Sequence, residues 1–524
     1  MILPSDEQRD SADQNSESEQ QAFEPKVPES DLAAGDDAEL SGSGAQSEVG
    51  SASADDPDSG PVGQHVSPTP NDSAGEPEEN SDEGLPEWEP LTPELVEDEA
   101  IRGDFMMRWA VILLAFLFGC TQIAETETLV HIKSGQYLME NGILPSGVDV
   151  FSFTAEGQPW VQISWLFDLI VAGLYVAGGA VTLTLAKALL AAVLCGVVQS
   201  ISRPGVSTWW GTICAAMMVI ACFQHFTALP ELVTLIGLAL TLLCLHRLSL
   251  DEDSLARWLL PVCFLVWANL DAGIYLGLVL LVLYGVGELL GGNDDEASDT
   301  VSRPRQLWTM IGCCLGAVLL NPFGWHTLLK PIVRYQVEYP AWREYIKVTS
   351  TSRPGPRDLH NYPMVPDVFW TWVDVHVVFA IALVVLALVS LFLNRSRLRL
   401  ALVLPLCGFV GMAVVASHEL AAVSLVACVV ATLNFQSWYQ ASFRQAYSVA
   451  SRELLFSRCG RAITVLAVFM LAFLVIAGHM TQSEDRAVGL GFSTSLEQEI
   501  LGVQGNVSAA FDDHTFNFRL DQGD

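Results

Sequence analysis

Long apolar runs separated by short polar segments fill the chain from about residue 105 to residue 480. A membrane-spanning helix needs about 20 consecutive, mostly apolar residues, and most of these runs reach that length. The pattern therefore predicts an all-α polytopic membrane protein with about 11–13 transmembrane helices. The runs lie near residues 105–123, 163–180, 182–202, 207–225, 230–248, 257–270, 273–291, 308–321, 373–394, 399–416, 419–435 and 462–480.

The arginines give the predicted helices an orientation, because basic residues mark the cytoplasmic side of a span. Arg102 and Arg108 place the start of the first run inside, and Arg458 and Arg461 place the start of the last run inside. The N-terminus is then inside and the segment after about residue 480 is outside. Twelve spans would instead return the chain to the inside. One run between about 160 and 250 must therefore be split, re-entrant or not a span.

The longest polar interruption in the first half of this body runs from Glu125 to Asp168. Its first part, residues 125–141, has the spacing of a short amphipathic helix. Asn141-Gly142, Pro145 and Gly147 then end that helix. A polar loop against a bilayer surface is where a multi-pass enzyme would meet a lipid-borne substrate. The alternative is a loop that only joins two spans. The residues able to share the apolar face of the helix are Leu129, Ile132, Tyr137 and Leu138.

Charge changes this picture mainly at the N-terminus. The 524 residues carry a formal charge of −34, and the segment up to Asp104 contributes −26 of it, from 29 acidic and 3 basic residues. This segment is rich in Ser, Gly and Pro and has almost no aliphatic clusters. Because it cannot bury enough apolar surface to offset its chain entropy, residues 1–104 are predicted to be a disordered acidic tail. Such a tail either binds a basic partner or is only a solvated extension.

Cysteine spacing bears on metals and disulfides. The eleven cysteines lie singly in apolar runs, apart from the adjacent Cys313 and Cys314, and none has a CxxC spacing. This distribution favours small packing residues over a metal site or a disulfide framework.

Four motifs in the polar loop carry a resemblance to a known family. They are Glu127-x-x-x-His131-x-x-x-Gly135, Asn141-Gly142-x-x-Pro145, Asp149-x-Phe151-Ser152-x-Thr154-x-x-Gly157-x-Pro159-Trp160 and Trp165-Leu166-x-Asp168. They resemble the first external loop of bacterial GT-C-type glycosyltransferase-like membrane proteins. Those proteins are similar in layout to protein mannosyltransferases and to the aminoarabinose transferases of lipid A. Two further phrases are similar, Trp267-Ala268-Asn269-Leu270-Asp271-Ala272-Gly273 and Asn321-Pro322-Phe323-Gly324.

The resemblance implies a GT-C-like fold and the transfer of a sugar from a polyprenyl-phosphate carrier to an acceptor on the external face. In the family, an acidic residue of this loop serves as catalytic base or orients the acceptor. Glu127 matches that position here, with Glu125 as its neighbour. Glu127 precedes His131 by four residues, so on a helix the two side chains can interact. Leu129 and Val130 stand where the family commonly has two tryptophans.

The predicted substrate-binding residues come from several parts of the chain. Ionisable groups in membrane segments cost about 2.5–3.5 kcal/mol at the centre on insertion scales, so each is a candidate site residue. Basic residues of the second long loop, 325–372, would hold the phosphate or pyrophosphate of the lipid. The two loop aspartates would position substrate or a divalent cation, although no spacing requires a metal. The alternative for each is a polar helix cap or a solvated loop. The set is His131, Asp149, Asp168, Glu231, Asp271, Arg343 and Lys347.

The rival function is that of a non-catalytic membrane protein, either a degenerate relative acting as a scaffold or a transporter. Transporters usually show two matching halves, and the sequence has no visible internal repeat. The expected partners are membrane lipid and a lipid-linked sugar, without nucleic acid. The expected location of the membrane domain, residues 105–480, is a bacterial cytoplasmic membrane. The polar segment 481–524 resembles the start of an external soluble domain. Either this segment is naturally short or the sequence is incomplete, and we favour the second interpretation.

Overall fold

The structure is a computed structural model, and it describes residues 92–151, 157, 159–250, 255–291, 302–328, 375–442, 451–478, 487–498 and 500. All of these residues belong to one compact unit, Pro86–Asp524. The predicted acidic tail lies outside the described residues up to residue 91. The loop residues Arg343 and Lys347 also lie outside them, as does the sequence after residue 500.

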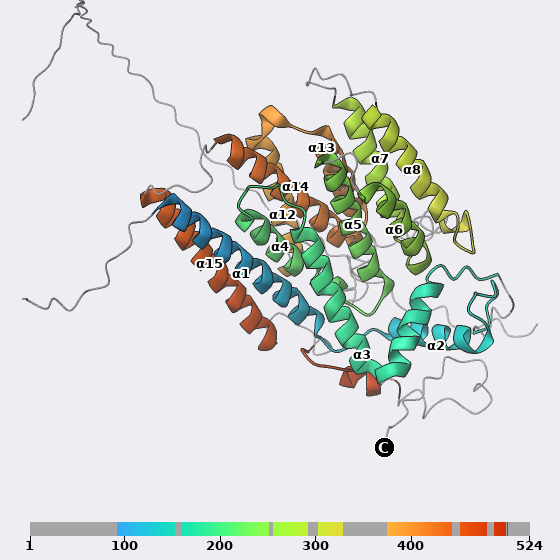
Figure 1. Cartoon of the computed structure of the whole chain (residues 1–524). Coiled ribbons are helices and arrows are strands. Elements are labelled where there is room, and N and C mark those ends of the chain that lie inside the picture. The colour runs from blue at the N-terminus through green and yellow to red at the C-terminus, as the bar shows by residue number, and fades with distance from the viewer. Residues whose placement is uncertain are drawn as a thin grey trace, which may run out of the picture. The chain divides into compact units, whose positions relative to one another are not determined.

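Apart from three isolated β-bridges, all regular secondary structure in the described part of the chain is helical (Figure 1), which confirms the all-α prediction. The α-helices are α1 (Pro93–Gly119), α2 (Thr126–Asn141), α3 (Trp165–Gln199), α4 (Trp209–Cys222), α5 (Pro230–Leu250), α6 (Ala256–Leu270), α7 (Ile274–Leu290), α8 (Ser302–Val318), α12 (Val375–Leu393), α13 (Leu400–Val415), α14 (Leu420–Ser442) and α15 (Ser451–Ile476). The short 3₁₀ helices are η1 (Phe223–His225), η3 (Arg395–Arg397) and η4 (Ser417–Glu419).

Five stretches of helix are long and apolar enough to cross a membrane, namely Trp165–Gln199, Pro230–Leu250, Val375–Leu393, Leu420–Ser442 and Ser457–Ile476. Shorter apolar helices lie at Trp209–His225, Ala256–Leu270, Ile274–Leu290 and Leu400–Val414. The chain is therefore an integral membrane protein with several membrane helices.

The first helix begins earlier than the apolar pattern predicts, so residues 93–104 of the predicted tail are helical. The α1 helix starts at Pro93, and the Thr92 hydroxyl accepts a hydrogen bond from the backbone N–H of Leu95 at 3.3 Å. A capping hydroxyl followed by proline is a favourable helix start. Within this polar first part of α1, Arg102 forms an ion pair with Asp98 one helical turn earlier, at 2.6 Å.

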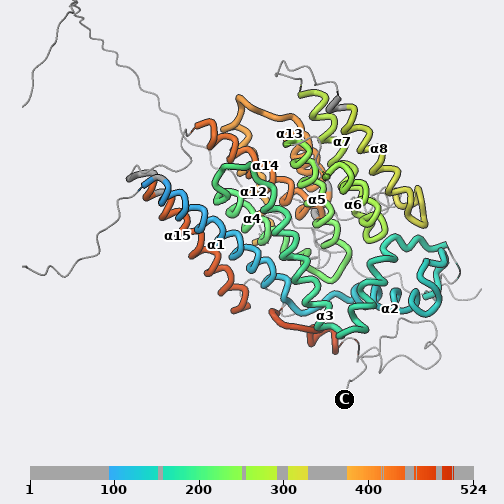
Figure 2. The backbone as a smooth tube through the Cα atoms, viewed as in Figure 1, coloured from blue at the N-terminus to red at the C-terminus, as the bar shows by residue number. Residues whose placement is uncertain are grey.

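Helix α3 is broken near its middle, at Gly178 and Gly179, whose backbones are not helical. Gly179 has φ of 64°, a conformation that glycine adopts without strain. Figure 2 shows α3 as two legs that meet at an angle. The first leg, residues 165–177, is roughly 20 Å long at 1.5 Å per residue. It packs against α2 at one end of the bundle, so the run predicted at 163–180 is the one that does not run from one end of the bundle to the other.

This break resolves the parity of the sequence-based topology. The segments that alternate between the two ends of the bundle are α1, the second leg of α3, α4, α5, α6, α7, α8, α12, α13, α14 and α15. Their number is odd, so among the described helices the chain starts at one end and finishes at the other. We call the end that carries α2 the α2 end, and the other the opposite end.

The segment after α15 returns to the α2 end and joins the chain that follows α1. Thr121 forms a bridge with Val488, and Ile123 forms one with Phe492. The backbone N–H of Gly489 donates to the Cys120 carbonyl at 3.0 Å. The described residues of the two external segments of the sequence-based topology, 125–162 and those after 480, therefore lie at the same end.

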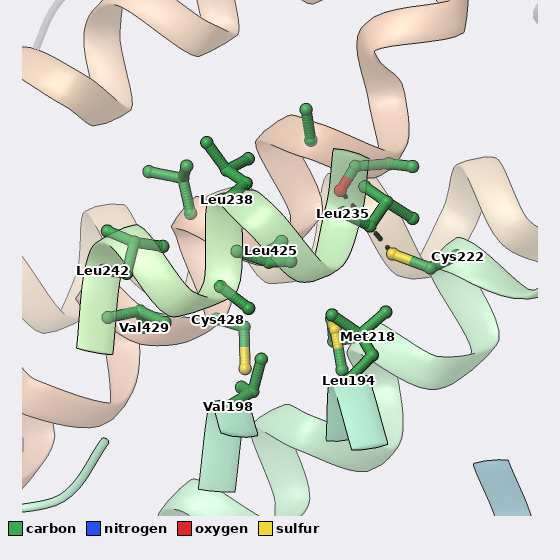
Figure 3. Packing of buried hydrophobic residues seen from close by; sticks show 14 of the residues in the cluster. Leu194, Val198, Met218, Cys222, Leu235, Leu238, Leu242, Leu425, Cys428 and Val429 are labelled. Carbon is green, nitrogen blue, oxygen red and sulfur yellow. Dashed lines mark hydrogen bonds between the residues drawn. The ribbon is translucent and has the colours of Figure 1, made fainter. Parts of the chain in front are cut away.

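The core of the bundle is centred on α14, whose apolar window is entirely buried. Figure 3 shows side chains of α3, α4, α5 and α14 packed together there. Between membrane helices the attraction is van der Waals packing, which small residues promote by letting backbones approach. Cys214, Cys222 and Cys428 are fully buried in this core, as expected of small packing residues.

A second hydrophobic cluster lies at the α2 end. It joins the base of α2 to the first leg of α3 and to the C-terminal segment. The cluster thus holds α2 against the end of the bundle. Its buried members are Ile123, Ile132, Phe167, Val171, Leu183, Ala228, Phe492, Leu496 and Ile500.

At the opposite end, Asp104 ties α1 to α4 and α15. Its carboxylate lies 2.9 Å from Arg461 Nε, and the two side chains are only 8% and 14% exposed. The same carboxylate accepts hydrogen bonds from the Ser207 hydroxyl at 2.7 Å and from the Thr208 backbone N–H at 3.0 Å. One buried side chain therefore holds three membrane helices in register.

Candidate functional site

The polar loop folds into the predicted helix and lies on the first leg of α3. The sequence favours residues 125–141 as a helix, and α2 occupies Thr126–Asn141. The two helices approach at Gly135, where an added Cβ would lie 2.0 Å from the Asp168 carbonyl oxygen and 2.6 Å from the Ala172 methyl group. Only glycine permits this approach, since any side chain there would collide with backbone.

The close approach assembles a polar cluster from α2, the following loop and α3. His131 Nδ1 lies 2.5 Å from Asp168 Oδ1. The amide of Gln162 donates to the other carboxylate oxygen of Asp168 and to the Ser134 hydroxyl. We call His131, Ser134, Gln162 and Asp168 the α2–α3 site.

Burial differs sharply between the two partners of the ion pair. The Asp168 side chain is 3% exposed, whereas the His131 side chain is 21% exposed. A carboxylate on one ring nitrogen fixes the orientation of an imidazole and leaves the other nitrogen for a ligand. The predicted interaction of Glu127 with His131 is replaced by this pair.

We expect Gly135→Ala to disorder the α2–α3 site. Overpacking against backbone costs about 1–3 kcal/mol, so amides of α2 should exchange with deuterium roughly 5–150-fold faster when detergent-solubilised protein is followed by mass spectrometry. Gly173→Ala is the control, because its Cβ would meet only the flexible Met139 side chain at 3.7 Å. It should exchange at the wild-type rate or more slowly, since alanine favours helix. Equal exchange in both variants would contradict the role given to Gly135.

The two predicted catalytic carboxylates occupy different environments at the start of α2. Glu127 is exposed in the first turn and, within the described residues, forms no hydrogen bond or ion pair. Glu125 precedes the helix and is partly buried, and its carboxylate accepts from the Ala124 backbone N–H at 3.3 Å. Glu127 is thus the carboxylate that is open to a ligand.

Asp149 serves the loop that follows α2. Its side chain accepts a hydrogen bond from the Phe151 backbone N–H at 2.9 Å, and its carbonyl accepts one from Gly157 at 2.8 Å. Phe151 in turn packs edge-on against Tyr137 and Trp160, with ring centroids 5.4 and 5.8 Å away. Asp149 therefore shapes the loop that follows α2.

The other predicted carboxylates form a second group where α5, α6 and α7 meet. The Thr234 hydroxyl donates to Asp271 and accepts from Trp267 Nε1 at 3.0 Å. Asp271 lies in the turn between α6 and α7, and burial raises the pKa of its carboxyl. The Thr234 hydrogen bond lowers that pKa, and the nearby Glu231 charge raises it. Glu231 itself is exposed in the first turn of α5.

A hydrogen bond connects the two groups. Trp165 Nε1, at the start of α3, donates to Asn269 Oδ1 at the end of α6 at 3.0 Å. Asn321 supports the same helix end, because its amide donates to the Ala268 carbonyl at 2.7 Å. The motif residues around 165, 269 and 321 thus meet at the α2 end, although they are far apart in sequence.

One polar group at this end is absent from the sequence-based site. The Tyr275 hydroxyl donates to Glu419, and His418 Nε2 lies 3.3 Å from the same carboxylate. Glu419 is buried, between α13 and α14. The adjacent His418-Glu419 pair between two apolar runs is the signal that could have identified it. An ionisable pair at a membrane helix end is a candidate functional feature.

The chemistry available at the α2 end is therefore that of exposed and anchored carboxylates with a partly exposed imidazole. Such groups can accept a proton, orient a hydroxyl or hold a cation. Among the described residues, no three His, Cys, Asp or Glu side chains are grouped closely enough to hold a metal ion.

Comparison with known proteins gives a similarity in structure only. No protein-family model matches the chain. No curated protein matches it in sequence. The crystal structure of the apo oligosaccharyltransferase of Archaeoglobus fulgidus is similar with a TM-score of 0.47 and 11% identity, over 78% of this chain and 60% of that one. This chain thus spans less than two thirds of that protein chain, and a likeness this distant carries no information on activity.

Proposed function

We propose that this protein is a membrane glycosyltransferase of GT-C type, which moves a sugar from a polyprenyl-phosphate carrier to an acceptor at the α2 end. The observation that supports the proposal best is the α2–α3 site. There, the His131–Asp168 pair is fixed beside the exposed Glu127, on a helix laid across the end of a membrane bundle. The motifs that resemble this family lie in the same place.

In the proposed reaction, the acceptor hydroxyl oxygen forms a bond to the anomeric carbon while the bond from that carbon to the phosphate oxygen breaks. Glu127 accepts the hydroxyl proton. His131, oriented by Asp168, donates a hydrogen bond to the sugar or the acceptor. The carrier leaves as an anionic phosphate, so the leaving group needs charge stabilisation more than protonation. Arg343 and Lys347 of the second long loop are proposed to supply that charge.

The test is transfer or hydrolysis of a radiolabelled polyprenyl-phosphate sugar by the full chain in detergent or in vesicles. Release of labelled sugar from the carrier, with or without an added acceptor, supports the proposal. Rates measured with and without an added divalent cation would show whether transfer depends on a cation held by the carboxylates. Absence of any release across a panel of donor sugars would favour the scaffold or transporter alternative.

We expect the α2 end to face the outside of the cell, as the arginines predict. In intact cells a cysteine introduced at Ser146, in the exposed loop after α2, should react with a membrane-impermeant thiol reagent. A cysteine at Ser396, exposed in η3 at the opposite end, should react only after lysis. Labelling above the background of the exposed native Cys313, Cys407 and Cys459 is the measurement. Labelling of position 396 alone in intact cells would show that the orientation is the reverse, with the α2 end in the cytoplasm.

A further inference from the structure

Four arginines gather at the opposite end of the bundle. Arg203 lies in the loop between α3 and α4, Arg247 in the last turn of α5, and Arg397 and Arg399 next to the start of α13. None of them forms an ion pair with a carboxylate within the described residues. This distinguishes them from Arg458 and Arg461, which are paired with Glu99 and Asp104.

Hydrogen bonds from neighbouring helices bring these arginines together. Two hydrogen bonds fix the loop before α4. Gln436 of α14 accepts from the Arg203 backbone N–H at 2.8 Å, and His246 Nε2 lies 3.2 Å from the Ser202 carbonyl. On the other side, the Asn394 amide donates to Asn434 of α14 at 3.0 Å and places η3 beside the same helix. Both arginine-bearing segments are thus anchored to the end of α14.

The charges are close enough to act on one another. Burial lowers the pKa of the Arg203 guanidinium, and the charges of Arg399 and Arg397 lower it further. Arg247 directly follows His246, whose ring contacts the Ser202 carbonyl next to Arg203. Arg203 Nε is buried and has no hydrogen-bond partner in the described part of the chain. A buried donor without a partner and a group of like charges both cost free energy, which a bound anion would recover.

Chemistry and position together select the anion. Guanidinium groups match phosphate oxygens in pairs of parallel hydrogen bonds. Arg399 also caps α13, whose first backbone N–H groups favour negative charge. All four arginines lie at helix ends or in the short loops between them, the level at which phospholipid headgroups meet a membrane protein.

We propose that Arg203, Arg247, Arg397 and Arg399 form a binding site for a phosphate group at the end of the bundle opposite α2. The group belongs either to an anionic phospholipid or to a soluble phosphate. The site is independent of the proposed sugar transfer, because it shares no residue with the α2 end. It is therefore tested by binding, whatever the outcome for activity.

The experiment is native mass spectrometry of the full chain released from detergent containing phosphatidylglycerol or phosphatidylcholine. We expect wild-type protein to retain phosphatidylglycerol preferentially. Since a hydrogen bond to a charged group is worth about 1.5–3 kcal/mol, Arg203→Gln and Arg399→Gln should each weaken retention by roughly 10–150-fold. Arg305→Gln, which removes an exposed arginine on α8, should retain phosphatidylglycerol like wild type. Arg399→Lys keeps the charge and should lose less than Arg399→Gln.

Added inorganic phosphate separates the two sources. Displacement of phosphatidylglycerol at millimolar phosphate assigns the site to a soluble anion, and persistence of the lipid assigns it to a headgroup. Equal retention of the two lipids, or an equal loss in Arg305→Gln, would overturn the proposal. A carbodiimide cross-link from position 399 of Arg399→Lys to a carboxylate in residues 1–91 would overturn it as well, because the chain's own acidic segment would then fill the site.

Discussion

Sugar transfer by Glu127→Gln is expected to fall by about 10²–10⁴-fold, the usual effect of removing a general base. The substitution keeps the size and hydrogen bonding of the side chain and removes its basicity. Glu127 is exposed and forms no bond within the described residues, so the fold should be unaffected. The measurement is the initial rate of transfer from a polyprenyl-phosphate sugar, compared between the variant and the wild type. Only variant protein that elutes from size-exclusion chromatography at the wild-type volume is used.

Glu125→Gln is the matched control for this substitution. It removes the same charge from the same helix end, so any effect on the helix dipole is shared. Glu125 precedes the helix with an extended backbone, and its partly buried carboxylate accepts from the Ala124 backbone N–H, whereas Glu127 is exposed in the first turn. We expect most transfer to survive. Wild-type rates in Glu127→Gln would refute its role as base, and a lack of transfer in every protein would favour a scaffold.

Much of the fold could be predicted because the length of an apolar run and the polar residues that end it are local properties of the sequence. The helix over residues 126–141 follows from the spacing of Ile132 and Leu138 and from the break at Gly142. The arginine distribution also required one run between residues 160 and 250 to be unusual. The structure identifies it as the first leg of α3, which ends at Gly178 and Gly179. In the sequence, the signal for this break is the pair of adjacent glycines within an apolar run.

The start of α1 could not be predicted from hydropathy. Residues 93–104 are charged, and in isolation such a segment belongs with the acidic tail. Asp104 and Glu99 are helical because their partners Arg461 and Arg458 arrive from α15, more than 350 positions later. Pairing at that sequence distance leaves no local pattern.

The sequence predicted which residues belong to the candidate site better than it predicted which of them contact one another. The motifs selected Glu127, His131 and Asp168, and spacing on the helix favoured a contact between the first two. The structure pairs His131 with Asp168 instead, because Gly135 lets α3 approach closely enough for a buried carboxylate to reach the ring. Glu419 was missed for a similar reason, since its partner Tyr275 comes from another helix.

The second large effect concerns stability and the Asp104–Arg461 pair. Removing one partner of a buried ion pair leaves an uncompensated charge and costs about 3–5 kcal/mol. Asp104→Ala also removes the acceptor for Ser207 and for the Thr208 backbone N–H at the start of α4. We expect its free energy of unfolding, measured by denaturant titration in detergent micelles, to fall by about that amount.

Two further variants separate a buried charge from a surface one. Glu99→Gln breaks the Arg458–Glu99 pair between the same two helices, but those side chains are 51% and 44% exposed. Exposed pairs contribute about 0–1 kcal/mol, so this variant should unfold much like wild type. The double variant Asp104→Leu with Arg461→Met removes both charges and should be more stable than Asp104→Ala, since no charge is left unpaired. A loss in Glu99→Gln as large as that in Asp104→Ala would mean that burial does not set the strength of the contact between α1 and α15.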